Sequence, residues 1–208
     1  MPDTDTLTRI LTKFNRTVNG RTPIVLDIGR EGLAALFAKL GYTRGAEVGV
    51  QKALYSEVLC QTIPGLHLYA IDSWCAYDGY LDESKQEKFD ACRAEAEGRL
   101  APFDCDIIPE WSLEAAKQIP DASLDFVYID ANHAFVDVVN DIDAWLKKIK
   151  PGGIIAGHDY TPRRRTIKCH VKQVVDCWCY TFHIEPLFLV TGDNRPGNRF
   201  ASWFWVVD

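Results

Sequence analysis

The chain has 208 residues, of which 47% are hydrophobic and 25% are charged, and its formal net charge is −6. This length and composition suit one globular α/β domain with a full core. No apolar run approaches the roughly 20 residues that a membrane-spanning helix needs. The acidic balance argues against a nucleic-acid partner, because such a partner requires a basic surface.

The N-terminal 43 residues are expected to form a helical extension packed on the main domain. Residues 5–18 place four apolar side chains on one face of a short helix, and a second helix follows Gly32. The first 14 residues have neither the basic start nor the apolar stretch of a signal peptide. The seven cysteines contain no C-x-x-C pair, so we expect free thiols rather than a structural zinc site, in a cytoplasmic protein.

From residue 44 to residue 208, the sequence predicts one domain in which strands alternate with helices. The expected strands cover residues 46–50, 66–71, 105–108, 124–129 and 153–156, and the helices cover 53–60, 83–100, 113–118, 135–149 and 170–180. This alternation is typical of parallel βαβ units. Two final runs, 184–190 and 202–207, have no helix between them and must pair antiparallel. We therefore predict an α/β, Rossmann-like three-layer sandwich with a seven-stranded, mostly parallel sheet and a C-terminal antiparallel hairpin.

Each of the five expected parallel strands ends in polar residues. In chain order these are Glu47 to Gly49, Asp72, Glu110 to Ser112, Asp130, and the pair His158 and Asp159. Ligands of an open parallel sheet bind beyond the carboxyl ends of its strands, so these residues predict a pocket. The first loop has one glycine, whereas a dinucleotide pyrophosphate calls for G-x-G-x-x-G. The loop therefore favours a ligand without phosphates, such as a nucleoside joined to an amino acid.

A second segment, Asp27-Ile28-Gly29, also reads as a strand end with a glycine loop. A pocket there would make eight strands and would shift each later acid by one strand. Register favours the loop at Glu47, because only this choice places Asp130 and His158 at the ends of the fourth and fifth strands.

Several segments together resemble the class I S-adenosylmethionine-dependent methyltransferases, and most closely the small type called methyltransferase domain 24. They are Glu47 to Val50, Tyr69 to Trp74, Phe126 to His133, Lys150 to Tyr160, and the ending Ser202-Trp203-Phe204-Trp205. The resemblance covers about residues 44–208. It departs at Ala53, where the family commonly has glycine, and this departure affects the fine geometry of the loop.

The resemblance implies S-adenosylmethionine as the cofactor and S-adenosylhomocysteine as its product. Glu47 and Gly49 would line the methionine end, and Gln51 and Ser56 would flank it. Asp72 would hold the ribose. The predicted adenine contacts are Trp74, Trp111 and Ser112, and Asp130 completes the predicted cofactor-binding set. For Trp74, simple core packing is the equal alternative.

The predicted catalytic residues are His133, His158 and Asp159. His133 could act as a general base, since an unperturbed histidine pKa near ~6.5 suits proton removal at neutral pH, or it could simply cap the following helix. Alternatively, Asp130, His158 and Asp159 could hold a divalent metal that lowers the pKa of the acceptor. Metal-dependent O-methyltransferases have a carboxylate at the place of His158, and this histidine disfavours magnesium.

The predicted function is methylation of a small molecule, with oxygen as the expected acceptor atom. Arg163, Arg164 and Arg165 follow the fifth strand and either grip an anionic acceptor or form a solvated loop. We expect no nucleic-acid or membrane partner, and a homodimer is among the expected assemblies. A methyltransferase-like protein that binds the cofactor without turnover is one alternative. A nicotinamide oxidoreductase is another, opposed by the missing G-x-G-x-x-G.

Overall fold

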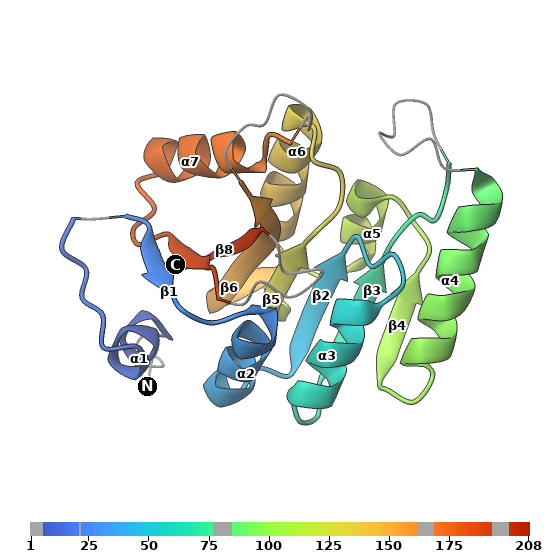
Figure 1. Ribbon diagram of the computed structural model, residues 1–208, viewed down its shortest axis with the longest axis horizontal. Helices are drawn as coiled ribbons and strands as arrows, with labels where there is room; N and C mark the ends of the chain where they lie inside the picture. The colour runs from blue at the N-terminus through green and yellow to red at the C-terminus, as the bar shows by residue number, and fades with distance from the viewer. Residues whose placement is uncertain (1–5, 21, 77–84, 162–168, 193–199) are drawn as a thin grey trace.

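A computed structural model describes residues 6–20, 22–76, 85–161, 169–192 and 200–208 (Figure 1). The predicted triple arginine, Arg163 to Arg165, lies outside these residues. Across the described part of the chain, no helix is long and apolar enough to cross a membrane. The seven cysteines are all free thiols, as expected.

Eight strands form one sheet. They are β1 (Ile24–Leu26), β2 (Arg44–Val48), β3 (His67–Ile71), β4 (Cys105–Ile108), β5 (Leu124–Ile129), β6 (Ile149–Tyr160), β7 (Phe188–Val190) and β8 (Ala201–Val206). Their order in the sheet is β1-β7-β8-β6-β5-β2-β3-β4. Strand β8 runs antiparallel to both of its neighbours, β6 and β7, and every other pair is parallel. The mostly parallel sheet and its C-terminal antiparallel hairpin are thus confirmed.

The sheet has eight strands, whereas the sequence predicted seven. The additional strand is β1, which pairs in parallel with β7 at the edge of the sheet, with Ile24 opposite Phe188. The N-terminal segment therefore contains two helices, Thr6–Lys13 and Arg30–Leu40, but also contributes a strand to the sheet. The alternative interpretation of Asp27-Ile28-Gly29 as a strand end had included this strand, but three residues are too few to show a clear alternation of apolar and polar side chains.

The position of β1 decides between the two candidate glycine loops. The loop Asp27-Ile28-Gly29 follows β1 at one edge, while the loop at Glu47 follows β2 in the middle of the sheet. Strand β2 lies between β3 and β5, which is where the strand order reverses and where ligands of open α/β sheets bind. The added strand therefore leaves the predicted register of the pocket unchanged.

Helices cover both faces of the sheet. One layer contains α2 (Arg30–Leu40), α3 (Leu54–Thr62) and α4 (Gln86–Leu100), and the other contains α5 (Ser112–Gln118), α6 (Phe135–Leu146) and α7 (Val171–Thr181). Figure 1 shows α2 and α3 in front of the sheet and α5 and α6 behind it. The short helix α1 (Thr6–Lys13) is tied to the start of β6 by a hydrogen bond from Thr6 Oγ1 to the carbonyl oxygen of Gly152.

The spacing of apolar residues decides which face each helix buries. In α2, Leu33, Leu36, Phe37 and Leu40 recur at helical spacing and are all buried. Phe37 stacks on Phe126 of β5 with 4.4 Å between the ring centroids. On the opposite face, α6 buries apolar side chains against β5 and β6 in the same manner. The two layers fix the strands from both sides and hold the strand-to-helix loops at one end of the sheet.

Candidate functional site

A cavity of about 860 Å³ opens at the carboxyl ends of β2, β3 and β5. Its size lies within the range of ordinary small-molecule pockets. Most of the predicted site residues line it, namely Glu47, Gly49, Gln51, Asp72, Trp74, Trp111, Ser112, Asp130 and His133. The predicted residues Ser56, His158 and Asp159 are buried behind its described wall.

Gly49 is required by a close approach between two strands. Its φ is +91°, and a Cβ atom at this position would lie 2.1 Å from the carbonyl oxygen of Asp130. Gly49 was expected to line the methionine end of the cofactor, and the atoms nearest to its Cβ position belong to the backbone that follows β5. Ala53, the departure from the family pattern, is fully buried and holds a left-handed conformation with φ +58° immediately before α3. The loop therefore keeps its left-handed turn without the usual glycine.

Asp72 fixes the loop that follows β2. One carboxylate oxygen accepts the backbone N–H of Gln51 at 2.8 Å, and the other accepts the backbone N–H of Trp74 at 2.9 Å. Burial raises the pKa of this carboxyl, although the two hydrogen bonds oppose the shift. An ionised carboxylate has about four acceptor positions, so Asp72 keeps capacity for two hydroxyl groups of a ribose.

Trp74 is a packed core residue that also forms part of the cavity wall. It belongs to a cluster with Ala96 and Leu100 of α4, and its indole N–H donates to the carbonyl oxygen of Gln51 at 2.8 Å. The core interpretation of this tryptophan is thus correct, and the side chain helps to hold the Gln51 loop in place.

Glu47 is a buried carboxyl at the end of β2 and points to the base of the cavity. Burial raises its pKa to about 8, and the hydrogen bond from Ser56 only partly opposes this shift. The side chain is therefore mostly protonated at neutral pH. Ser56 is fully buried on α3 and supports Glu47 from behind instead of lining the cavity.

Arg30 is a site residue that sequence reasoning missed. It is the first residue of α2, and its Nη1 atom lies 3.5 Å from Oδ2 of Asp130. Its guanidinium lies over the ring of Tyr55, 5.1 Å from the centroid. The signal was present in the discarded glycine loop, because a cation directly after Gly29 begins a helix that packs beside α3.

The opposite end of the cavity is formed by the start of α5. The side chain of Trp111 is about half exposed there, while the Ser112 hydroxyl donates to Asp141 at 2.5 Å and accepts the indole N–H of Trp145 at 2.9 Å. Asp141 is a second residue that the sequence did not reveal. Burial raises its pKa to about 6, so it adds a buried acid to this end of the cavity.

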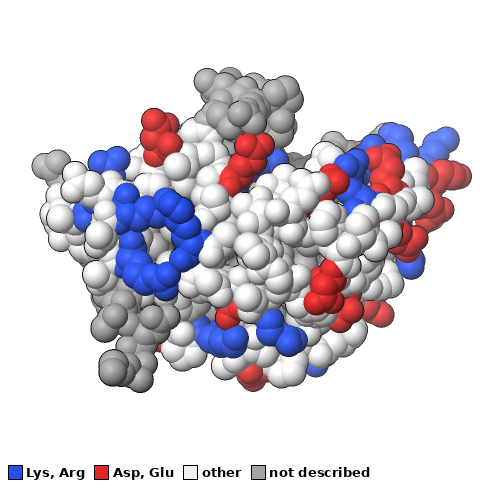
Figure 2. Space-filling view, turned by 90° about the horizontal axis from the view of Figure 1, so that it is seen from below, with Lys and Arg blue, Asp and Glu red and all other residues white. Residues whose placement is uncertain are grey.

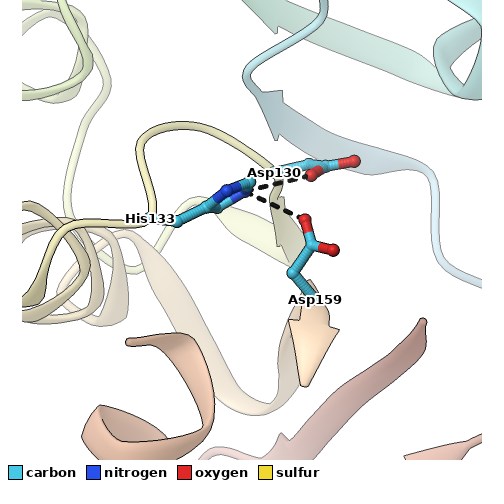
Figure 3. A group of neighbouring side chains, drawn as sticks. All are labelled: Asp130, His133 and Asp159. Carbon is cyan, nitrogen blue, oxygen red and sulfur yellow. Dashed lines mark ion pairs between the residues drawn. The ribbon is translucent and has the colours of Figure 1, made fainter. Parts of the chain in front are cut away.

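At the cavity wall, Asp130 and His133 converge with Asp159, which lies behind them at the end of β6 (Figure 3). The Nε2 atom of His133 lies 2.9 Å from Oδ2 of Asp159 and 3.9 Å from Oδ1 of Asp130. His158 approaches the same carboxylates through Nδ1, at 3.4 Å from Asp159 and 3.7 Å from Asp130. Asp159 has a φ of +57°, a strained backbone conformation that is often found at functional sites.

The two carboxylates control the protonation of His133. Burial alone would lower its pKa, but the ion pairs with Asp130 and Asp159 outweigh burial and raise the pKa to about 10. Burial would also raise the pKa of Asp159, but His133 and His158 hold it well below its usual range. His133 is therefore protonated at neutral pH, in contrast to a histidine with an unperturbed pKa near ~6.5.

His133 does not cap helix α6. The N-cap residue is Ala134, which has no side-chain cap, and its N–H donates to Oδ1 of Asn132 at 2.9 Å. The imidazole of His133 instead turns toward the carboxylates of Asp130 and Asp159. Local sequence could not separate these two roles, because both place a histidine just before the helix.

The residues with metal-ligating geometry differ in one member from the predicted set. Asp130, His133 and Asp159 each offer a ligand atom, and these atoms lie within 4.8 Å of one another. The predicted metal-binding set contained His158, whereas the structure brings His133 to the two carboxylates. His133 follows Asp130 by three residues in a loop, and the sequence pattern does not show where a loop side chain points. His158 stays adjacent to both carboxylates through its Nδ1 atom.

Comparison with known proteins places this geometry in a family. A family model described as a methyltransferase domain matches residues 46–160, which include the loop after β2 and the ends of β3, β5 and β6. A search among curated proteins found no match.

Solved structures with the same fold include several methyltransferases. An O-methyltransferase from Bacillus cereus, in complex with S-adenosylhomocysteine, aligns with a TM-score of 0.61 at 14% identity, over 86% of this chain and 80% of its own. The O-methyltransferase TomG from Streptomyces achromogenes, in complex with S-adenosylmethionine, aligns with a TM-score of 0.60 at 17% identity, over 86% and 80%. A putative caffeoyl-CoA O-methyltransferase from Staphylococcus aureus gives a TM-score of 0.62 at 16% identity, over 96% and 92%.

Proposed function

The chain belongs to the class I S-adenosylmethionine-dependent methyltransferases, and from this premise we propose that it methylates a hydroxyl oxygen of a small molecule. The observation that carries this proposal is the pair formed by His133 and Asp159. The pair lies beside Asp130, at the same end of the sheet as the cofactor-binding loop. A base in contact with the cofactor cavity is what an acceptor with a removable proton requires.

The described residues fit S-adenosylmethionine. Asp72 has acceptor capacity left for ribose hydroxyls, and the carboxyl groups of Glu47 and Asp130 suit a cationic amino-acid group. Trp111 and Ser112 line the far end, where an adenine would contact a half-exposed indole ring. When bound, the cofactor supplies an electrophilic methyl group on a positively charged sulfur.

We propose that His133 removes the acceptor proton through Nδ1. Its Nε2 atom faces Asp159, so the opposite ring nitrogen is the one left for an acceptor, and Asp159 orients the ring and stabilises the imidazolium. The pKa near 10 in the ligand-free protein requires that His133 lose a proton before it can act. A cationic ligand beside Asp130 lowers this pKa, and we expect turnover to rise from neutral toward alkaline pH.

A divalent cation held by Asp130, His133 and Asp159, with His158 next to it, is the second candidate mechanism. It is favoured by the contact between His133 Nε2 and Asp159, which is short but lacks the alignment of a regular hydrogen bond. Two imidazoles and two carboxylates suit a transition metal better than magnesium. A cation there would lower the pKa of a hydroxyl acceptor.

An anionic acceptor bound by Arg163, Arg164 and Arg165, a homodimer and a cytoplasmic location all stay predictions from the sequence.

The test combines cofactor binding with turnover. Calorimetric titration should show that S-adenosylhomocysteine binds and that NAD does not; the reverse result would overturn the proposal. Methyl transfer is then measured against a panel of hydroxylated acceptors, beginning with caffeoyl-CoA, which the name of the Staphylococcus aureus protein suggests.

The substitution His133→Ala should leave the affinity for S-adenosylhomocysteine within about threefold and lower turnover about 10²- to 10⁴-fold. His67→Ala is the matched control, because His67 is a partly buried residue of β3 that is paired with Asp104 outside the described lining of the cavity, and it should keep full turnover. Full activity of His133→Ala would remove His133 from the mechanism. Activity that a chelator abolishes and Mn²⁺ or Zn²⁺ restores would favour the second mechanism.

A further inference from the structure

Three charged or ionisable side chains gather at the end of the cavity formed by β2 and α2. Two are acids, Glu47 and Asp130, and the third is Arg30. Lys52 also lines the cavity, but its side chain is 41% exposed and its Nζ atom is paired with Glu95 at 2.8 Å. Lys88, the remaining lysine of the described lining, is exposed as well, so Arg30 is the cation of that lining that lies against Glu47 and Asp130.

Arg30 is held in place from two sides. The guanidinium lies over the Tyr55 ring, and the Tyr55 hydroxyl donates to the Arg30 carbonyl oxygen at 3.1 Å. Its Nη1 atom is paired with Asp130, and its side chain is 21% exposed. Because Tyr55 and Asp130 already contact the guanidinium, the ordering of the side chain does not depend on a ligand. A guanidinium in fixed orientation loses little conformational entropy on binding.

The charges at this end are complementary to an α-amino acid. An α-amino acid carries an ammonium group and a carboxylate on the same carbon. A site that binds both therefore needs an acidic and a cationic side chain next to each other. Glu47 and Asp130 alone would attract the ammonium and repel the carboxylate. Arg30 supplies the cation, and its five N–H donors allow it to bind a carboxylate while it keeps the contact with Asp130.

The two oxygens of Asp130 divide its contacts. Oδ2 faces Arg30, while Oδ1 faces His133 and His158. A ligand whose amino-acid group lies at Arg30 therefore lies next to the cluster of His133 and Asp159. This arrangement is the one that methyl transfer needs, since the sulfur of the cofactor is joined to its amino-acid part by two carbons.

We infer that Arg30 binds the α-carboxylate of the cofactor, with Glu47 and Asp130 receiving its ammonium group; the inference rests on the proposed function. Arg30 precedes the segment that the family model matches, residues 46–160. The N-terminal segment thus completes the cofactor site and selects ligands that carry an intact amino acid over plain nucleosides.

Binding of truncated ligands tests the inference without any need for turnover. The probes are S-adenosylmethionine, its decarboxylated form, which lacks only the carboxylate, and 5′-methylthioadenosine, which lacks the whole amino-acid group. Wild-type protein should bind decarboxylated S-adenosylmethionine about 10- to 100-fold more weakly than the intact cofactor, the range for a charge-assisted hydrogen-bonded pair.

The variant Arg30→Met should bind S-adenosylmethionine about 10- to 100-fold more weakly than wild-type protein does. It should bind the intact and the decarboxylated cofactor with equal affinity. Its affinity for 5′-methylthioadenosine should be unchanged, which shows that the nucleoside end is intact. Arg30→Lys should recover part of the loss. Arg93→Met is the matched control, because Arg93 is exposed on α4 and paired with Glu97, outside the described lining.

Each outcome decides one claim. If Arg30→Met binds S-adenosylmethionine as tightly as wild-type protein does, the assignment of Arg30 is wrong. If Arg30→Met does not fold, the comparison in wild-type protein still decides, since equal affinity for the intact and decarboxylated cofactors overturns the assignment. If wild-type protein binds neither S-adenosylmethionine nor S-adenosylhomocysteine, it is the proposed function that fails.

Discussion

At the scale of single residues, the loop after β2 combines backbone strain with close packing. Gln51 and Ala53 both hold left-handed conformations, with φ of +50° and +58°, and Gly49 has φ +91°. For a residue with a Cβ atom, this conformation costs about 1–2 kcal/mol. Asp72 and Trp74 stabilise the loop through the hydrogen bonds to Gln51. The pocket is thus shaped before any ligand enters.

The substitution Gly49→Ala should abolish measurable binding of S-adenosylhomocysteine and destabilise the protein by about 2 kcal/mol or more. The added Cβ would lie 2.1 Å from the Asp130 carbonyl oxygen, so β2 and β5 must separate at this point. Calorimetric titration and urea unfolding measure the two effects.

Gly65→Ala is the control for this substitution. Gly65 also has a positive φ, +67°, but a Cβ there would meet nothing within 4 Å. It should therefore cost only the conformational penalty of about 1 kcal/mol and leave binding intact. Equal losses in the two variants would show that the contact with Asp130 is unimportant.

At the scale of elements, helix α2 connects the edge of the sheet to the pocket. It begins at Arg30, buries one face against the sheet, and ends at Gly41, which has φ +81° and donates its N–H to the carbonyl oxygen of Ala38. Such a left-handed glycine is a common end of a helix. The helix thus fixes the backbone of Arg30, and the contacts with Tyr55 and Asp130 position its guanidinium.

Two glycine-to-alanine substitutions should have opposite effects on stability. Gly41→Ala should destabilise the protein by about 1 kcal/mol, because alanine must adopt the left-handed conformation at this helix end. Gly98→Ala, at an exposed position inside α4, should stabilise it by about 0.5–1 kcal/mol, because alanine is the better helix former.

A new Cβ at either glycine would have no heavy atom within 4 Å outside its own local backbone, so packing does not contribute to the difference. Denaturant unfolding of Gly41→Ala and Gly98→Ala measures the change in the free energy of unfolding that each substitution causes. The same sign for the two substitutions would contradict the explanation by backbone conformation.

At the scale of the whole molecule, the charged groups at the pocket differ from those on the face farthest from it. Figure 2 shows the face at the amino ends of the central strands, away from the pocket. On this face, basic side chains gather on the side of α1, and acidic side chains are more numerous toward α4. The buried acids Glu47 and Asp141 lie inside the cavity, where burial raises the pKa of each. The molecule thus keeps at the cavity two carboxyl groups whose ionisation is disfavoured by burial.

The substitution Glu47→Gln should stabilise the ligand-free protein, and increasingly so as the pH rises. The folded protein holds the proton of Glu47 up to a pKa of about 8, whereas the unfolded chain releases it near 4.5. Glu47 therefore favours unfolding progressively between pH 4.5 and 8, and its removal should add a few kcal/mol at pH 8 and almost nothing at pH 4.5.

Urea unfolding of wild-type protein and of Glu47→Gln at several pH values measures the difference between their free energies of unfolding. The contributions of all other titratable groups cancel in this difference. Saturating S-adenosylhomocysteine should reverse the order of stability, because its ammonium group favours the ionised form of Glu47 in wild-type protein alone. A difference that does not vary with pH would contradict the burial of an ionisable Glu47.

The sequence by itself determined the alternation of strands and helices and the acids that end each strand. Apolar periodicity and strand-end polarity are local properties, and Glu47, Asp72 and Asp130 follow from them. The family resemblance rested on the same segments, and the family match includes them.

Only the tertiary structure decided how separate elements meet. It placed β1 beyond β7 at the edge of the sheet, brought Arg30 to Asp130, and paired His133 with Asp159. It also moved the pKa of His133 from an ordinary value to about 10. Strand order and the contacts between distant side chains depend on packing of the whole chain, and the electrostatic environment of a buried group exists only after that packing has formed.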